Sequence, residues 1–383
     1  MQPAERASVV PGAVSGTSVP IALPKRDDPA DLSPPISPQG LPSLPLIDQF
    51  GRIHRSLRIS VTDRCNIRCQ YCMPEIASFL PQHALLSFDE ITQFVRVVMA
   101  MGIRDVRITG GEPLMRPQLP DLLRRLVNIP ELNDLALTTN GMLLADQLPQ
   151  LVSAGLRRVN ISLDTLSEAV FRRLSRRAGL DQVLAGIDAA AREPAVQVRL
   201  NALVMRDVNF DEVLDLVEFA RERSIAIRFI EFMPLDAERL WNRTQMVSGA
   251  EMRARLSVRF GTLVPLDRRD SSQPSTDYTF ADGSGVVGFI DSVSQPFCGA
   301  CDRLRLTADG KLRNCLFGLE EWDMRGLLRQ ANSTPATAGE DGLEMTKALE
   351  STVRACLAAK RAAHGIDAVD FAPPERAMFQ IGG

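Results

Sequence analysis

Between residues 57 and 229, six short runs rich in branched and apolar residues alternate with amphipathic helical patterns, and few folds accommodate such an alternation. A repeated strand–helix–strand order requires parallel pairing with right-handed crossovers. We therefore predict an α/β fold, an incomplete (βα)6-type TIM barrel, because six units fall short of the eight that close such a barrel. The expected strands are residues 57–61, 106–108, 135–137, 159–163, 198–204 and 225–229.

Two of the intervening segments show apolar residues at helical spacing, so each helix is expected to pack one face on the sheet. The positions, at i, i+3, i+4 and i+7, are Ile91, Phe94, Val95 and Val98 in one helix and Val213, Leu216, Val217 and Ala220 in the other. Asn209, three residues before Glu212, predicts a capping box at the start of the second helix.

The character of the chain divides it into three parts. Residues 1–46 are rich in Pro, Ser, Ala and Gly and are predicted to be a disordered arm. Residues 47–245 carry the barrel, and residues 246–383 carry an α+β cap with a helix near 248–258, short strands near 278–280 and 286–290, and a last helix from about 342. Cys356 shares the apolar face of that helix and is predicted to be a core residue.

The charge balance argues against a general affinity for polyanions. The chain has 44 Lys and Arg against 47 Asp and Glu, a net charge of −3, so nucleic acid and membrane are not expected partners. There is no apolar run of about 20 residues and no secretory or transit pattern, which favours a cytoplasmic location.

The first cysteine group, Cys65, Cys69 and Cys72, follows the first expected strand, at the end of the barrel where chemistry occurs. Three thiolates so close together repel one another unless a cation neutralises them, and soft sulfur ligands select zinc or an iron–sulfur cluster. A structural zinc site closes with four ligands, so three cysteines favour a site with an open position. Zinc with His54 or His83 as the fourth ligand is the alternative.

A second group, Cys298, Cys301 and Cys315, also lacks an obvious fourth ligand. We interpret it as an auxiliary three-cysteine cluster whose open iron can bind a substrate heteroatom. Arg303 and Arg305 lie between these cysteines and share one side of an expected strand, which suits a phosphate-bearing substrate. A solvated strand face is the alternative for the two arginines.

Two glycine motifs have different interpretations. Gly110-Gly111 ends the second expected strand at the reactive end of the barrel, where the lack of side chains lets backbone approach a ligand. Residues 283–288 match G-x-G-x-x-G but lead into a β-rich run, so they predict a hairpin turn with Asp282-Gly283 as its signal, and not a dinucleotide site.

The C-x3-C-x2-C spacing, with Tyr71 before the last cysteine, resembles the signature of the radical S-adenosylmethionine (SAM) superfamily. The resemblance implies a [4Fe-4S] cluster on Cys65, Cys69 and Cys72 whose fourth iron binds SAM. Reductive cleavage of SAM would then give methionine and a 5′-deoxyadenosyl radical.

Further runs narrow the resemblance to the family of GTP 3′,8-cyclases, over about residues 47–383. They are residues 57–65, 107–114 and 229–233, the second cysteine group with its arginines, and the terminal Ile381-Gly382-Gly383. The family converts GTP to (8S)-3′,8-cyclo-7,8-dihydroguanosine 5′-triphosphate in molybdenum cofactor biosynthesis, which implies two [4Fe-4S] clusters and SAM as cofactors. In this family the glycine tail reaches the active site.

The resemblance also implies site residues, although no radical-quenching residue is assigned. For SAM they are Tyr71, Gly111, Ser162 and Met233, for GTP they are Arg58, Arg107, Thr138, Arg199, Arg303 and Arg305, and Cys298, Cys301 and Cys315 hold the second cluster. Arg199 stands where the family often has Lys, so the charge is kept but the geometry differs. Asp105 stands where a Lys can occur.

The implied partners are GTP and a downstream cyclic pyranopterin monophosphate synthase, while the electron donor is unknown and a homodimer stays open. Another radical SAM enzyme with an auxiliary cluster, such as a peptide-modifying one, is an alternative, although such clusters usually use more cysteines. A zinc-containing nucleic-acid-binding protein is the alternative outside enzymes, and it would be colourless where an iron–sulfur protein is brown.

Overall fold

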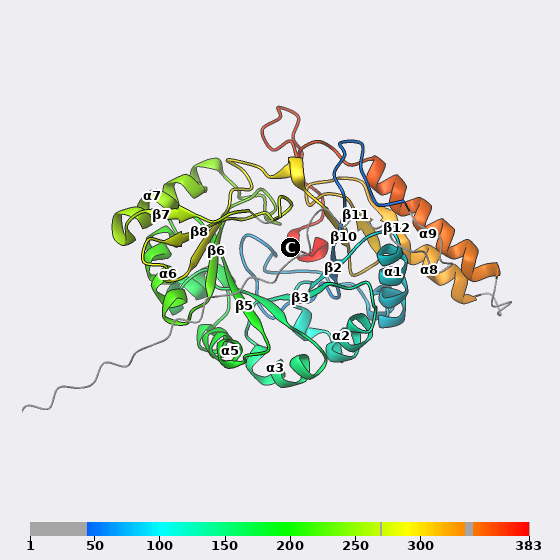
Figure 1. The fold of residues 1–383 in the computed structure, drawn as a ribbon, viewed down its shortest axis with the longest axis horizontal. Coiled ribbons are helices and arrows are strands. Elements are labelled where there is room, and N and C mark those ends of the chain that lie inside the picture. The colour runs from blue at the N-terminus through cyan, green and yellow to red at the C-terminus, as the bar shows by residue number, and fades with distance from the viewer. Residues whose placement is uncertain (1–43, 269, 334–339, 383) are drawn as a thin grey trace, which may run out of the picture.

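The computed structural model describes residues 44–268, 270–333 and 340–382. Its strands form a curved sheet that surrounds a central space, and most of the helices lie around the outside (Figure 1). The predicted α/β partial barrel with a C-terminal extension is thus confirmed. Of the predicted arm, residues 1–43 lie outside the described residues, whereas Leu46 is fully buried and accepts a 2.8 Å hydrogen bond from the backbone of His54.

All six predicted strands are present, and each pairs in parallel with the next along the chain. Their bounds are β1 (Ser56–Ser60), β2 (Asp105–Thr109), β3 (Asp134–Thr139), β4 (Arg158–Ser162), β5 (Gln197–Val204) and β6 (Ala226–Glu231).

The helices between these strands pack their apolar faces on the outside of the sheet, as predicted. The predicted apolar positions of α1 (Phe88–Ala100) and α6 (Val213–Glu222) are all buried. A capping box starts α1, where the Ser87 hydroxyl accepts from the Glu90 backbone at 3.1 Å and the Glu90 carboxylate accepts from the Ser87 backbone at 2.6 Å. The other crossover helices are α2 (Leu119–Val127), α3 (Leu144–Ser153), α4 (Glu168–Ser175) and α5 (Leu180–Arg192).

The capping box predicted at Asn209 was wrong. The Asn209 side chain is buried and bonds within its own loop, accepting from the Met205 backbone at 2.8 Å and donating to the Leu203 carbonyl at 2.7 Å. The Glu212 carboxylate instead accepts from the Thr165 hydroxyl at 2.6 Å and the Leu166 backbone at 2.8 Å. The side chains of Asn209 and Glu212 therefore form hydrogen bonds to these other groups, and they do not form the capping box that their spacing predicted.

The C-terminal region extends the same sheet at both edges. β9 (Val286–Ile290) pairs in parallel with β6, and β10 (Arg303–Leu306) pairs in parallel with β1, so eight neighbouring strands run parallel. Strands were predicted near residues 286–290 and at Arg303 and Arg305, but their parallel pairing with β6 and β1 was not, because neither strand is part of a strand–helix repeat. The outer strands are antiparallel: β7 (Leu263–Pro265) and β8 (Thr276–Phe280) beyond β9, and β11 (Lys311–Arg313) and β12 (Trp322–Asp323) beyond β10.

Two smaller predictions about this region are confirmed. The G-x-G-x-x-G run forms the turn and second strand of the β8–β9 hairpin, with Gly283 at φ 72°. Cys356 is fully buried in α9 (Glu340–Ala358). The other long helices of this region are α7 (Gly249–Phe260) and α8 (Met324–Ser333). Among the described helices, none is both long and apolar enough to cross a bilayer.

Along most of their length the parallel strands alternate between an apolar outer face and a polar inner face. Paired positions in neighbouring strands share a face, so the register places Arg305, Arg58 and Arg107 in one row on the inside. Leu57, on the opposite face, is fully buried in the main core. A polar interior is unusual for parallel strands, which are normally apolar on both sides, and it makes the centre of the barrel suited to a hydrophilic ligand.

Candidate active site

The first cysteine group lies in the loop that leaves the carboxyl end of β1. This loop is pinned to α4, because the Arg68 backbone donates to the Ser175 carbonyl at 2.8 Å. The Asn140 side chain contacts the Cys65 sulfur at 3.8 Å. Gly111 packs so closely on the loop that a Cβ there would lie 2.4 Å from the Arg64 carbonyl. The Gly-Gly pair therefore lets the loop after β2 touch the cysteine loop.

The surroundings of the three cysteines in this group favour cluster-bound thiolates over free thiolates. Burial, and then the nearby Glu112 carboxylate, raise the pKa of Cys65 to about 11. Burial, and then the neighbouring Cys72, raise the pKa of Cys69. Three buried thiolates therefore need a strongly cationic partner. Across the described residues no three His, Cys, Asp or Glu side chains gather closely enough to share one metal ion, whereas a four-iron cluster holds its ligands further apart.

The residues implied for SAM all come from the same end of the barrel. Ser162 is the last residue of β4, Met233 follows β6, and Gly111 follows β2. Tyr71, between two of the cysteines, donates a 2.5 Å hydrogen bond to the Asp164 carboxylate just beyond β4. The loops after β1, β2, β4 and β6 thus converge where this fold class places its chemistry.

The second cysteine group lies at the opposite end of the same strands. Cys298 and Cys301 precede β10, which runs parallel to β1, and Cys315 follows β11, which returns antiparallel to β10. The β10–β11 hairpin therefore brings the three cysteines to the amino end of β10. Burial alone would raise the pKa of Cys301, but the adjacent charges of Arg303 and Lys360 lower it to about 6, which favours the thiolate.

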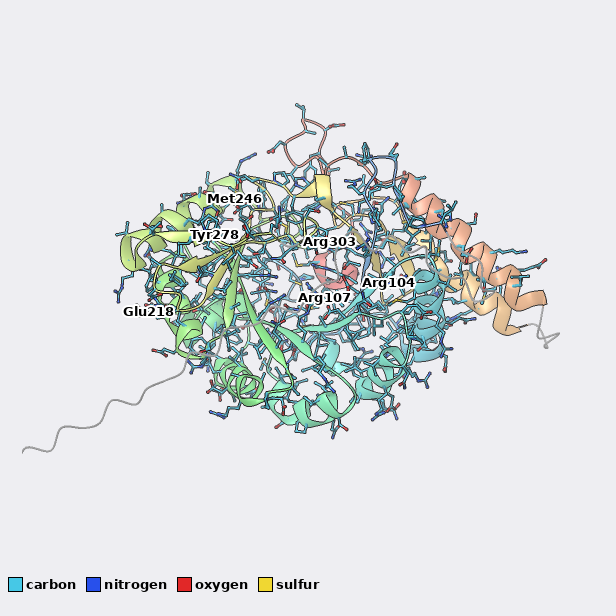
Figure 2. The ribbon with its side chains drawn as sticks, in the orientation of Figure 1. Arg104, Arg107, Glu218, Met246, Tyr278 and Arg303 are labelled. Atoms are coloured by element: carbon cyan, nitrogen blue, oxygen red, sulfur yellow. The ribbon has the colours of Figure 1, made fainter. Side chains whose placement is uncertain are left out.

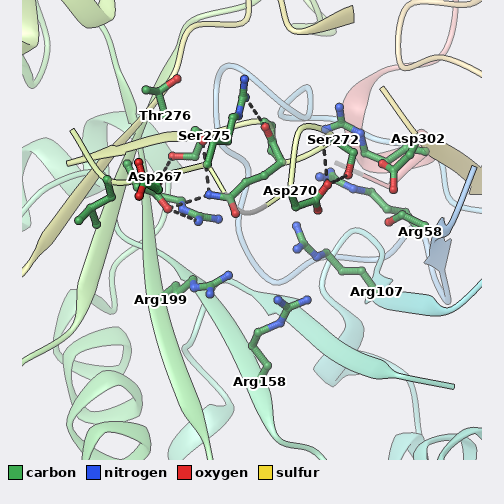
Figure 3. Close-up of a pocket in the computed structure, with 18 residues that line it drawn as sticks. Arg58, Arg107, Arg158, Arg199, Asp267, Asp270, Ser272, Ser275, Thr276 and Asp302 are labelled. Atoms are coloured by element: carbon green, nitrogen blue, oxygen red, sulfur yellow. Dashed lines mark hydrogen bonds and ion pairs between the residues drawn. The ribbon is translucent and has the colours of Figure 1, made fainter. Parts of the chain in front are cut away.

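A cavity lined by arginines occupies the amino end of the barrel, beside the second cysteine group. The strand arginines face the segment between β7 and β8 across this cavity (Figure 3). Its strand-borne arginines are Arg58, Arg107, Arg158, Arg199, Arg228 and Arg303. Sequence reasoning missed Arg158 and Arg228, although both lie on the same strand face as the predicted arginines and that alternation would have revealed them.

Positive charge is crowded in this cavity. Burial, and then the guanidinium of Arg58, lower the pKa of Arg107. Burial, and then Arg228, lower the pKa of Arg199 to about 9. Carboxylates offset part of this charge, since Asp277 pairs with Arg228 at 2.9 Å. An anion bound among the arginines would relieve their mutual repulsion.

Three of the polar atoms in this region are buried without any hydrogen-bond partner among the described residues. They are Nε of Arg107, Nη2 of Arg303 and Oγ1 of Thr138. Buried polar atoms are normally satisfied, so these atoms indicate a missing ligand. All three belong to residues that the family resemblance implied for GTP.

Arg305 has a different environment from the other predicted GTP residues. It is buried on β10 but does not line the cavity, and its Nη1 donates a hydrogen bond to the carbonyl of Gly382. The C-terminal helix α10 (Met378–Ile381) lies within the ring of strands (Figure 2), and its Phe379 packs with Met73 beside the first cysteine group. The prediction that the tail enters the barrel holds for Gly382, while Gly383 lies outside the described residues.

A partial barrel with three cysteines after its first strand is the arrangement of a radical SAM enzyme, and the model of the Radical SAM superfamily matches residues 59–220. The model of Molybdenum Cofactor Synthesis C matches residues 225–366. The fold is also that of SuiB from Streptococcus suis bound to its precursor peptide SuiA, with a TM-score of 0.51 and 16% identity over 76% of this chain and 67% of that one.

Curated relatives identify the particular family. The chain is 49% identical over 342 residues to the GTP 3′,8-cyclase of Rhodopirellula baltica, covering 88% of this chain and 92% of that protein. It is 42% identical over 370 residues to the GTP 3′,8-cyclase of Mycobacterium sp. strain KMS, covering 96% and 100%. The chain belongs to the GTP 3′,8-cyclase family, and its cofactors are SAM and two [4Fe-4S] clusters.

Proposed function

We propose that this chain cyclises GTP to (8S)-3′,8-cyclo-7,8-dihydroguanosine 5′-triphosphate in molybdenum cofactor biosynthesis. The observation that carries the proposal is the arginine-lined cavity, whose buried and unpartnered donors lie between the two cysteine groups. A triphosphate carries about four negative charges, and charge-assisted pairs with guanidinium groups are the strongest way to hold it. The chain has a net charge of −3, so this concentration of arginines is local.

The substrate would lie inside the barrel, between the two cysteine groups. The triphosphate and ribose would be bound by Arg58, Arg107, Arg199, Arg303 and Thr138. Arg158 and Arg228 complete the same cavity and are added to this set. The guanine would face the second cluster, held by Cys298, Cys301 and Cys315.

At the other end, Cys65, Cys69 and Cys72 would hold the first cluster, and Tyr71, Gly111, Ser162 and Met233 would orient SAM. SAM bound there supplies the radical that removes hydrogen from C3′ of the GTP ribose. The residues of the barrel would hold the ribose and the guanine of GTP in fixed positions relative to each other, so that C3′ and C8 are close enough to join. Close packing of the loops around this end would limit the access of other groups that could donate hydrogen to the radical.

The remaining assignments of the proposal concern organisation and partners. Residues 47–245 would form the radical SAM unit, residues 246–383 would supply the second cluster and the tail, and residues 1–46 would have no part in the chemistry. The chain would act in the cytoplasm, and a cyclic pyranopterin monophosphate synthase would take up its product. Two copies of the chain would form a homodimer.

Anaerobic incubation of the reconstituted protein with SAM, dithionite and GTP, followed by mass analysis of the nucleotide, tests the proposal. We expect 5′-deoxyadenosine and a product with the mass of GTP that yields a pterin on acid treatment and oxidation. ATP in place of GTP is the matched control, because it carries the same triphosphate on a different base. Unchanged GTP in the presence of SAM cleavage would favour the peptide-modifying alternative, and a colourless protein containing zinc would refute both.

A further inference from the structure

A buried lysine contacts the second cysteine group. Lys360 follows the end of α9 and is only 3% exposed. Its ammonium group lies 3.6 Å from the sulfur of Cys301 and donates to the backbone carbonyls of Arg303, at 3.0 Å, and Asn314, at 2.7 Å. The two carbonyls lie next to two different cysteines of the group, because Arg303 lies two residues after Cys301 and Asn314 immediately precedes Cys315.

The charge of Lys360 has no carboxylate partner within the described part of the chain. Two of its acceptors are neutral carbonyls, so the sulfur of Cys301 is its one contact that can carry a negative charge. An ammonium group buried without a counter-ion is costly, and buried charges are therefore normally paired. The partner that justifies burying Lys360 is thus the anionic thiolate cluster.

The first cysteine group has no equivalent contact among the described residues. Among these residues, the side chain that donates to the sulfur of Cys65 is the neutral amide of Asn140, at 3.8 Å. The nearby guanidinium of Arg68 donates instead to the carbonyls of Cys65 and Ile67. The two clusters would therefore sit in different electrostatic surroundings.

We propose that Lys360 is a positioning residue that raises the reduction potential of the second cluster by placing a fixed positive charge against the thiolate of Cys301. The proposal rests on the assignment of Cys298, Cys301 and Cys315 made above. Reduction adds one electron and makes the cluster more negative, so an adjacent cation stabilises the reduced form more than the oxidised form. The proposed effect is electrostatic and involves no proton transfer.

The test is a potentiometric titration of the anaerobic two-cluster protein with dithionite, followed by electron paramagnetic resonance. Lys360→Met keeps the length of the side chain and removes its charge. At the potential where the wild-type second cluster is half reduced, we expect its ratio of reduced to oxidised forms to fall about tenfold, a shift of about 59 mV for one electron. Lys360→Arg should restore most of the ratio, and the first cluster should not change.

Two controls separate this effect from others. Lys347→Met removes an exposed lysine from α9 and should shift neither cluster. A protein with serine at Cys65, Cys69 and Cys72 assigns the remaining signal to the second cluster. If this protein holds no cluster at all, the cysteine assignment fails, whatever Lys360 does.

The outcomes for Lys360 itself are distinct. A lower potential in Lys360→Met that Lys360→Arg reverses supports the proposal, and so does loss of the second cluster in Lys360→Met with its retention in Lys360→Arg. An unchanged potential in Lys360→Met with both clusters present overturns it. Loss of the second cluster in both variants also overturns it, since a role in packing would then suffice.

Discussion

Arg305, on β10, donates a hydrogen bond from its guanidinium to the backbone carbonyl of Gly382, which lies 77 residues further along the chain. The bond fastens the C-terminal tail inside the barrel, next to the row of inward-facing arginines. Because Arg305 pairs in register with Arg58 of β1, the tail and the proposed phosphate site are fixed by neighbouring residues of one sheet. A change in the tail should therefore affect the bound substrate directly.

Gly382→Ala should suppress cyclisation. Gly382 has a φ of 81°, and a Cβ there would lie 2.6 Å from the hydroxyl of Thr109. Alanine in this left-handed conformation costs about 1–2 kcal/mol, and its Cβ would also clash with Thr109. Together these effects should displace the tail. The yield of cyclised nucleotide should then fall about tenfold, which corresponds to about 1.4 kcal/mol. Mass analysis of the nucleotide measures the yield, and SAM cleavage should persist.

The control for Gly382 is Gly261→Ala. Gly261 has a φ of 78°, but no atom lies within 4 Å of a Cβ built there. The control variant therefore also places alanine at a positive φ, but far from the tail. Equal yields from the two variants would show that strain alone, and not the position of the tail, matters.

Arg303→Ala should weaken GTP binding by about 2–4 kcal/mol, because it leaves a phosphate oxygen without its charge-assisted partner. Arg305→Ala should weaken binding by less, since Arg305 does not line the cavity and bonds to Gly382. Isothermal calorimetry measures both affinities. Arg192→Ala, at a residue whose side chain is 80% exposed, should leave the affinity unchanged. An affinity for GTP that survives Arg303→Ala would move the phosphate site elsewhere.

Serine at Cys65, Cys69 and Cys72 together should halve the iron content from about eight atoms per chain, because each group can hold one four-iron cluster. This variant should also lose reductive SAM cleavage, whereas serine at the second group should halve the iron and keep the cleavage. Iron assay and chromatography of 5′-deoxyadenosine measure the two effects. Cys356→Ser is the control, since this buried thiol lies in the helical core and should hold no iron.

Asp309→Asn should destabilise the protein by about 1–3 kcal/mol at pH 7. Arg376, just before the tail helix, donates two hydrogen bonds to the Asp309 carboxylate, at 3.0 and 2.9 Å. Burial acts to raise the pKa of Asp309, but the hydrogen bonds from Arg376 and Thr307 outweigh it and hold the pKa below 3.8. The folded carboxylate therefore contributes stability above pH 3.8 that is lost as the pH falls through its lowered pKa.

Urea unfolding of wild type and Asp309→Asn at several pH values checks this. The difference between them should be full near pH 7 and shrink below about pH 4. Asp121→Asn, which removes an exposed pair with Arg124, should cost less than about 1 kcal/mol at any pH. A difference for Asp309→Asn that does not change on acidification would contradict the assignment of the ion pair.

The repeating part of the fold could be predicted from the sequence because its signals are local. The apolar runs and the helical spacing of residues such as Ile91 and Val213 depend only on near neighbours, and they placed six strands correctly. Strands were also expected at β9 and β10, but their parallel pairing with β6 and β1 could not be predicted in the same way, because it joins residues far apart in the sequence. The capping box at Asn209 failed for a related reason, since Asp164 and Thr165 compete for its side chains.

The cysteine groups and several arginines could be identified because their spacing itself carries chemical information. Arg158 and Arg228 were missed because a single arginine in a strand is common, although the alternation along their strands places both on the face of the predicted arginines. Lys360 was missed as well. It lies 59 residues from Cys301, and nothing in its own neighbourhood distinguishes it from a surface lysine.

The two edge strands supplied by the C-terminal region also have a consequence for biosynthesis. β1 leaves the ribosome long before its partner, because Ser56 pairs with Arg303, and β6 must likewise wait for β9. Until then the nascent barrel presents two unpaired parallel edges, which can join to other chains. Pairing across so long a separation is intrinsically slow. The newly made protein should therefore depend on chaperones until its last third is synthesised, and truncations within that third should aggregate instead of accumulating as a folded barrel.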